Sequence, residues 1–267
     1  MRIGFVTDEI SANVEEALNI GVSWGIRDFE LRMMGEHRVP AVDAGDIRRV
    51  IALRQRHGLR ITALSPGVFK GTLQDEARLT SELHDTLPET FHLARVFDTK
   101  TIIIFGFQRS AGDTADHEWK AVEVLRRAAW SAQEYGMTLA VENEPGFWCD
   151  TGANTARVLA QVNSAALCAN WDPANALGTE PEPFPEGYNA LKKWIANVHV
   201  KDAVQGTSAE YVAVGEGNVD WRGQLQALVR DKAVEQVTIE THCLPLLENS
   251  QKNLKAVRGI LAAVSLT

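Results

Sequence analysis

The chain has 267 residues, of which 45% are hydrophobic and 23% are charged, the composition of an ordinary globular protein. Lys and Arg total 27 against 35 for Asp and Glu, which gives a formal net charge of −8. This balance argues against a nucleic-acid partner, because affinity for a phosphate backbone comes from basic side chains. No apolar run approaches the roughly 20 residues that span a bilayer, so no membrane partner is expected either.

The cysteine pattern indicates the cellular compartment in which the protein is expected. Cys149, Cys168 and Cys243 are an odd number of thiols and include no Cys-x-x-Cys pair, which is not the pattern of a disulfide framework. The first residues also lack the apolar region and the cleavage site of a signal peptide. We therefore expect a cytoplasmic protein with reduced thiols.

Short apolar runs alternate with longer amphipathic segments along the chain. The runs have the β-branched and aromatic content of buried parallel strands and span 2–7, 27–32, 59–65, 101–107, 137–142, 166–172, 196–202 and 235–241. Helices are predicted over 13–24, 44–57, 75–98, 114–136, 152–163, 185–195, 219–231 and 248–264. This alternation predicts a single α/β domain over residues 1–267, a (β/α)₈ TIM barrel. A doubly wound sheet is the alternative, although no Gly-x-Gly-x-x-Gly follows the first strand.

The last four predicted strands each end in a side chain that can bind a metal ion. These side chains are Glu142, Asp172, His199 and Glu240. In a barrel the catalytic groups lie at the carboxyl ends of the strands. The two-residue period of a strand allows all four side chains to face the barrel interior. Because consecutive strands are neighbours, we expect the four side chains to converge.

Such a cluster needs a counter-ion. Three carboxylates and a neutral imidazole would carry a charge of about −3, which is costly to bury. Oxygen-rich ligands with a single histidine suit Mn²⁺, Mg²⁺, Co²⁺ or Fe²⁺, and Zn²⁺ is also compatible. One strand-end carboxylate alone is more often a helix cap, but four groups on consecutive strands favour a metal site. Glu144 and His242, each two residues beyond a proposed ligand, compete for the same roles.

With these residues in place, the chain resembles the sugar phosphate isomerase/epimerase superfamily, the xylose isomerase-like TIM barrels. The resemblance covers essentially the whole chain and is strongest in AVENEP, NWDPANAL, NVHVKD, VGEGNVDW and TIETH. It implies one divalent metal ion, held by Glu142, Asp172, His199 and Glu240. It also implies that Glu142 and Glu240 move protons next to a carbonyl through an enediolate, in an isomerase or epimerase of a sugar, ketose or related polyol.

Five further residues are candidates for binding the substrate: Lys201, Asn175, Glu144, Trp148 and Arg32. Lys201 matches the family's Lys-Asp pair after the histidine. Asn175 and Glu144 depart from the family pattern, because many relatives carry histidine at these positions. Trp148 is either an apolar wall for a sugar or a packed loop residue. Arg32 either contacts a substrate anion or forms an ion pair with Glu30.

The substrate partner expected from this resemblance is a small carbohydrate, and assembly into a homo-oligomer is left open. An inosose-type dehydratase and a hydroxypyruvate-type isomerase share the scaffold and are alternative functions. A metallo-phosphodiesterase related to abasic-site endonucleases is less favoured, because its trinuclear zinc site requires more histidines. Schiff-base chemistry at Lys201 is disfavoured because neighbouring carboxylates would raise the pKa of its amine. A ligand-binding barrel without catalysis is the last alternative.

The glycine-rich segment 203–218 has no helical period. It is expected to be a mobile loop. Closure of this loop over a bound substrate would exclude water from the site.

Overall fold

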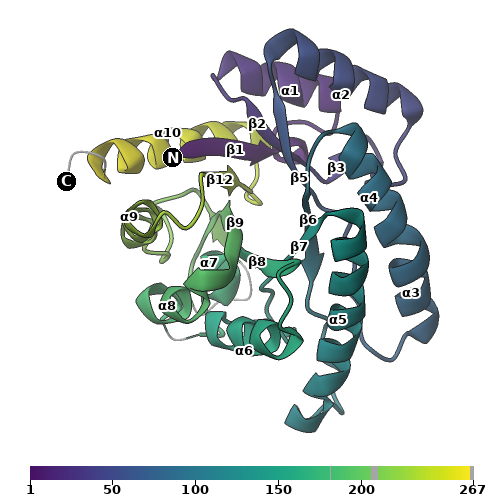
Figure 1. Ribbon diagram of the computed structural model, residues 1–267. Coiled ribbons are helices and arrows are strands. Elements are labelled where there is room, and N and C mark those ends of the chain that lie inside the picture. The colour runs from purple at the N-terminus through teal and green to yellow at the C-terminus, as the bar shows by residue number, and fades with distance from the viewer. Residues whose placement is uncertain (181, 206–209, 265–267) are drawn as a thin grey trace.

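The computed structural model describes residues 1–180, 182–205 and 210–264, and it shows a closed barrel of parallel strands (Figure 1). The barrel strands are β1 (Arg2–Val6), β2 (Asp28–Leu31), β5 (Arg60–Leu64), β6 (Thr101–Phe105), β7 (Thr138–Glu142), β8 (Leu167–Trp171), β9 (Ile195–Val200) and β12 (Gln236–Ile239). Their order around the barrel is β1-β12-β9-β8-β7-β6-β5-β2. Seven of them lie within a predicted strand, and β9 begins one residue before its predicted range of 196–202, so the predicted (β/α)₈ barrel is confirmed.

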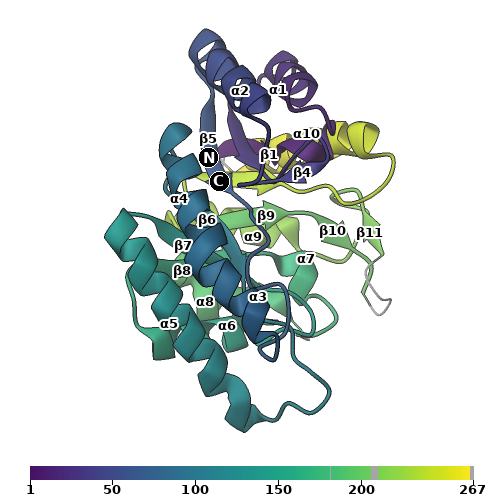
Figure 2. The same ribbon diagram turned by 90° about the vertical axis from the view of Figure 1, so that its right-hand side faces the viewer.

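Helices surround the strands, as Figures 1 and 2 show. The α-helices are α1 (Val14–Ser23), α2 (Ala44–His57), α3 (Glu76–Ser81), α4 (Leu87–Val96), α5 (Glu118–Tyr135), α6 (Gly152–Val162), α7 (Pro173–Ala176), α8 (Tyr188–Leu191), α9 (Trp221–Asp231) and α10 (Leu246–Val264). Gly58 and Gly136 end α2 and α5 with φ of 62° and 70°, a conformation that glycine adopts without steric cost. In the described part of the chain, no helix has both the length and the apolarity to cross a membrane.

Two predicted helices differ from the observed ones. The predicted helix over 75–98 is divided into α3 and α4 by a π-helical turn. In this turn the Glu82 carboxylate accepts a hydrogen bond from the backbone amide of Phe69. The predicted helix over 185–195 is reduced to α8 and a 3-10 turn. Phe184 is extended just before this segment because Pro185 disfavours helical dihedrals in the residue that precedes it.

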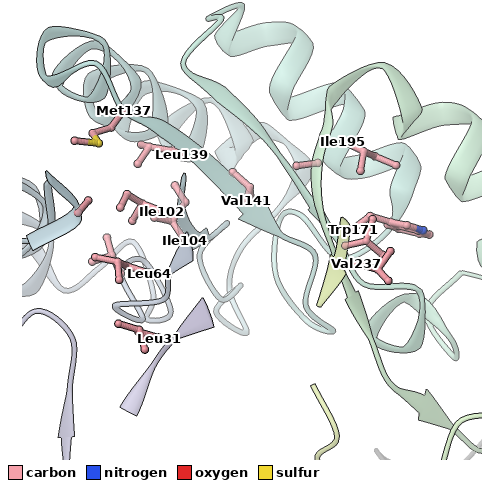
Figure 3. Packing of buried hydrophobic residues seen from close by; sticks show 14 of the residues in the cluster. Leu31, Leu64, Ile102, Ile104, Met137, Leu139, Val141, Trp171, Ile195 and Val237 are labelled. Atoms are coloured by element: carbon pink, nitrogen blue, oxygen red, sulfur yellow. The ribbon is translucent and has the colours of Figure 1, made fainter. Parts of the chain in front are cut away.

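Most of the apolar core lies between the barrel and its helices. Figure 3 shows alternate strand residues in this layer, among them Ile102, Ile104, Leu139 and Val141. The strand residues between them point into the barrel. Their apolar members form a separate small cluster, which consists of Ala63, Ile103 and Ala140. This alternation turns the polar side chains at the strand ends toward the barrel interior, as the two-residue period predicted.

Two short antiparallel ribbons that the sequence did not predict stand at the carboxyl ends of the strands. The first pairs β3 (Met33–Met34) with β4 (His37–Arg38), and the second pairs β10 (Asp202–Ala203) with β11 (Tyr211–Val212). Figure 2 shows β4 and the β10–β11 ribbon on the same side of the barrel.

The buried carboxylate of Asp202 holds the second ribbon and the turn after it. It accepts hydrogen bonds from the backbone amides of Ala203, Gly215, Gly217 and Val219. The later part of the glycine-rich segment 203–218 is thus attached to the end of β9. Residues 206–209 of this segment lie outside the described residues, and its closure over a substrate stays a prediction.

One ion pair joins the outer surfaces of α5 and α6. Glu118 accepts hydrogen bonds from the Arg157 guanidinium and, at 2.7 Å, from the Gln161 amide. The hydrogen bond from Arg157 lowers the pKa of Glu118 and outweighs the opposite effect of its partial burial. The ionised carboxylate is therefore more stable in the folded protein than in the unfolded chain.

Replacing Arg157 by Met is expected to lower the free energy of unfolding by about 1 kcal/mol at pH 7. A carboxylate with a depressed pKa stabilises the fold above its unfolded pKa, and it loses this contribution as the pH falls through its folded pKa. The difference between Arg157→Met and the wild type should thus shrink below about pH 4. Urea denaturation at pH 7 and again below about pH 4 measures the difference in free energy of unfolding between the two proteins. Arg127→Met, an exposed change on α5, is the control; an equal loss in that variant would contradict the prediction.

Candidate metal centre and active site

The four predicted metal ligands converge at one end of the barrel. Glu142, Asp172, His199 and Glu240 each offer a ligand atom within 4.8 Å of those of the other three, and all four are buried. Their strands β7, β8, β9 and β12 are consecutive neighbours in the barrel order. Parallel pairing places the ends of these strands at a similar level, with one register shift between β8 and β9 after Ala169. The structure therefore brings together the set of side chains that the sequence predicted.

His199 is held from both sides of its ring. Nδ1 lies 3.4 Å from Glu142 Oε1 and 3.4 Å from Glu240 Oε2, whereas Nε2 lies 3.0 Å from Glu30 Oε2. Glu30 is fully buried on β2 and also accepts a hydrogen bond from Asn197. A carboxylate on the far nitrogen orients a metal-binding imidazole and increases its basicity. Glu30 was not predicted as part of the site, and its expected ion pair with Arg32 is not formed.

Lys201 contributes a buried cation. Its Nζ atom lies 2.9 Å from Asp172 Oδ2 and 2.8 Å from Glu240 Oε2, and the residue is only 2% exposed. Burial lowers the pKa of Lys201, but the adjacent Asp172 and Glu240 carboxylates outweigh burial and hold this pKa well above its usual value. The amine is therefore protonated, which does not suit Schiff-base chemistry.

One observation tests whether the cluster fits a divalent ion. Asp172 Oδ2 is buried and accepts no hydrogen bond in the described structure, although Lys201 lies close to it. The Lys201 ammonium group, 2.9 Å away, already balances the charge of this oxygen, so the test rests on the chemistry of the donor set. Three carboxylates and one imidazole are a donor set that Mn²⁺, Mg²⁺, Co²⁺ and Zn²⁺ accept. The residues present fit a single divalent ion.

Arg32 neutralises the opposite side of Glu240. Its guanidinium donates to Asp8 Oδ2 at 2.9 Å, to Glu9 Oε1 at 2.6 Å and to Glu240 Oε1 at 2.6 Å. Burial raises the pKa of Glu240, yet Lys201 and His199 outweigh it and hold this pKa well below its usual value. Three carboxylates already occupy the Arg32 donors, so the geometry does not support the predicted contact of Arg32 with a substrate anion.

The other predicted substrate residues have different positions. Asn175 is 1% exposed and donates to Asn143 O at 2.9 Å and to Glu142 Oε1 at 3.3 Å, so it supports Glu142 from behind. Trp148 is packed in the hydrophobic core and does not line the cavity. Glu144 does line the cavity, and its burial together with the Glu142 charge raises its pKa.

A cavity of about 270 Å³ opens above the cluster and exposes Glu142, Lys201 and Glu240 to a ligand. This volume is below the ~300–1,000 Å³ of typical ligand pockets, which favours a small substrate. Tyr211 on β11 closes one side: its hydroxyl donates to Asn175 Oδ1 at 3.3 Å and its ring centroid is 5.1 Å from Lys201 Nζ. Tyr211 could not be predicted as part of the site, since it lies before the VGEGNVDW motif and in no periodic pattern.

Comparison with known proteins defines the family. Residues 18–261 match the family model of the xylose isomerase-like TIM barrel, and the chain belongs to this family. A search of curated protein sequences found no significant match.

Solved structures show the same fold. The zinc-bound IolI protein has a TM-score of 0.81 at 18% identity, and the match covers 99% of both chains. The probable 3-DHS dehydratase AsbF from Bacillus anthracis has a TM-score of 0.79 at 20% identity, covering 97% of this chain and 99% of the other. The 3-keto-D-glucoside 4-epimerase YcjR from E. coli has a TM-score of 0.75 at 16% identity, covering 100% of both chains.

Replacing Glu30 by Gln is expected to weaken Mn²⁺ binding by about tenfold or more, because the amide no longer holds the His199 ring as a carboxylate does. Isothermal titration calorimetry of metal-stripped protein measures the affinity. Asp28→Asn is the matched control: Asp28 is a buried carboxylate on the same strand that pairs with Arg60 instead. Equal Mn²⁺ affinity in Glu30→Gln and the wild type would show that Glu30 does not support the metal centre.

Proposed function

We propose that the protein is a divalent-metal-dependent isomerase or epimerase that moves a proton at a carbon next to the carbonyl of a small sugar, ketose or related polyol. The observation that carries this proposal is the convergence of Glu142, Asp172, His199 and Glu240 under one cavity. A bound divalent ion would polarise the carbonyl and hydroxyl oxygens of such a substrate. Family membership and the epimerase and dehydratase among the similar structures support this chemistry.

Two glutamates are in position to transfer the proton. Glu142 ends β7 and Glu240 follows β12, and these strands flank the two strands that carry the other proposed ligands. A substrate above the cluster would therefore lie between two carboxylates. Both oxygens of Glu240 contact cations, Arg32 at Oε1 and Lys201 at Oε2. Glu142 contacts Asn175 and His199 through Oε1. We expect Glu142 to be the stronger base of the pair.

Two further groups assist in this proposal. The Lys201 ammonium group lines the cavity and is fixed by Asp172 and Glu240, so it is placed to stabilise negative charge that develops on a substrate oxygen. Glu144 faces the same cavity with a raised pKa, which favours its protonated form. A protonated carboxyl group can donate a proton to the reacting substrate.

The alternative functions differ in the step after proton removal. A dehydratase expels a hydroxyl group from the neighbouring carbon, whereas an isomerase returns the proton. A panel of ketoses, inososes and hydroxypyruvate, tested with Mn²⁺-loaded protein, distinguishes these reactions. A trinuclear phosphodiesterase site is not supported: the other candidate cluster in the described residues, Glu9, Glu240 and His242, already contains the Arg32 guanidinium.

Glu142→Gln and Glu240→Gln should each slow turnover by about 10²-fold or more, with the larger effect for Glu142→Gln, because an amide keeps the shape of the side chain but is no base. The measurement is exchange of the substrate C–H with solvent deuterium, followed by NMR on a substrate identified from the panel. Glu123→Gln on the exposed face of α5 is the control. If neither variant slows exchange while the metal stays bound, the two-glutamate mechanism is wrong, and Glu144 or His242 becomes the candidate base.

A further inference from the structure

Two cations at the cavity have no part in the proton transfer. Arg38 ends β4 in the ribbon after β2, and Lys70 lies in the loop after β5; both line the cavity. In the barrel order, β2 and β5 are neighbours and lie across the barrel from β8 and β9, which carry Asp172 and His199. The two cations therefore face the proposed metal ligands from the other side of the cavity.

Arg38 retains unused donors. Its guanidinium donates to the backbone oxygen of Ser65 at 3.1 Å, and no carboxylate of the described residues lies within 4.0 Å of it. A guanidinium has five N–H donors in a planar fork that matches a carboxylate or a phosphate. Burial and the nearby Arg32 charge lower the pKa of Arg38, so an anion beside it would be favourable. Arg32, by contrast, contacts three carboxylates.

Lys70 lines the same cavity as Arg38, with its charge only weakly balanced. Its Nζ atom is 3.7 Å from Glu144 Oε1, too far for a hydrogen bond, and 4.5 Å from the centroid of the Phe105 ring. Its side chain is 48% exposed, so a ligand can reach the ammonium group. The Phe105 face supports the lysine without using its N–H donors.

We propose that the substrate is an anion whose carboxylate or phosphate group pairs with Arg38 and Lys70 while its carbonyl end lies over the four metal ligands. This inference rests on the proposed function and defines its substrate class. The cavity of about 270 Å³ suits a short molecule that spans from one wall to the other. Hydrogen bonds between ionised partners are about twice as strong as neutral ones, so the two cations would select for the charged end.

Three unreactive probes with the same four-carbon skeleton test the proposal on Mn²⁺-loaded protein: erythritol, D-erythronate and D-erythritol 4-phosphate. Calorimetry is expected to show at least tenfold tighter binding of one or both anions than of erythritol. The anion with the larger gain identifies the terminal group as a carboxylate or a phosphate. Arg38→Met should reduce this preference about tenfold, and Lys70→Met about threefold because Lys70 is more exposed. Arg56→Met, an exposed change on α2, should keep the full preference.

Two results would overturn the inference: equal affinity of wild-type protein for all three probes, or an anion preference that survives in the Arg38→Met/Lys70→Met double variant. The second result would place the anion on the metal ion itself. Lys70→Met, which changes an exposed side chain, decides the matter if Arg38→Met does not fold. Mn²⁺ binding is measured first without a probe. A wild-type protein that binds no Mn²⁺ refutes the proposed function and this inference together, whereas Mn²⁺ binding without anion preference refutes only this inference.

Discussion

Charge neutralisation among buried carboxylates determines the geometry of the barrel mouth. Lys201 contacts Asp172 and Glu240. Arg32 contacts Glu240 and also Asp8 and Glu9, which lie in the first loop, after β1. Buried charges are tolerated only when they are paired and hydrogen-bonded, and removing one partner leaves the other exposed to the full cost of desolvation. The cations therefore fix the relative positions of the first loop, β2, β9 and β12, and the cavity takes its shape from them.

The barrel separates stability from chemistry. The outer layer between strands and helices holds the large apolar side chains, such as Leu139 and Val141, and supplies the hydrophobic stabilisation. The inner cluster of Ala63, Ile103 and Ala140 is small. Polar side chains fill the space above it, and His199 lies there against the carboxylate of Glu30. Changes in this inner layer can thus alter the site while the outer core maintains the fold.

The sequence predicted features that depend on local pattern. Buried strands are recognised by their apolar runs, and Asp172 or His199 by its place at the end of such a run. Glu30 could not be predicted, because it meets His199 across the barrel from a position 169 residues away. Arg38 and Tyr211 lie on short ribbons whose approach to the cavity depends on how the loops pack. The departures at Asn175 and Glu144 were visible in the sequence, but only the structure separates a supporting residue from one that lines the cavity.

The Lys201 ammonium group has a consequence for how the protein matures. Many metal sites are assembled only when the ion binds, because their ligands repel one another in the empty state and the energy of binding is also energy of folding. Here a side chain of the chain itself supplies positive charge between Asp172 and Glu240. The polypeptide can therefore complete its fold without an ion. If the proposed function holds, the identity of the ion would be decided on a finished site, by which ion is supplied and which exchanges fastest, and not during folding.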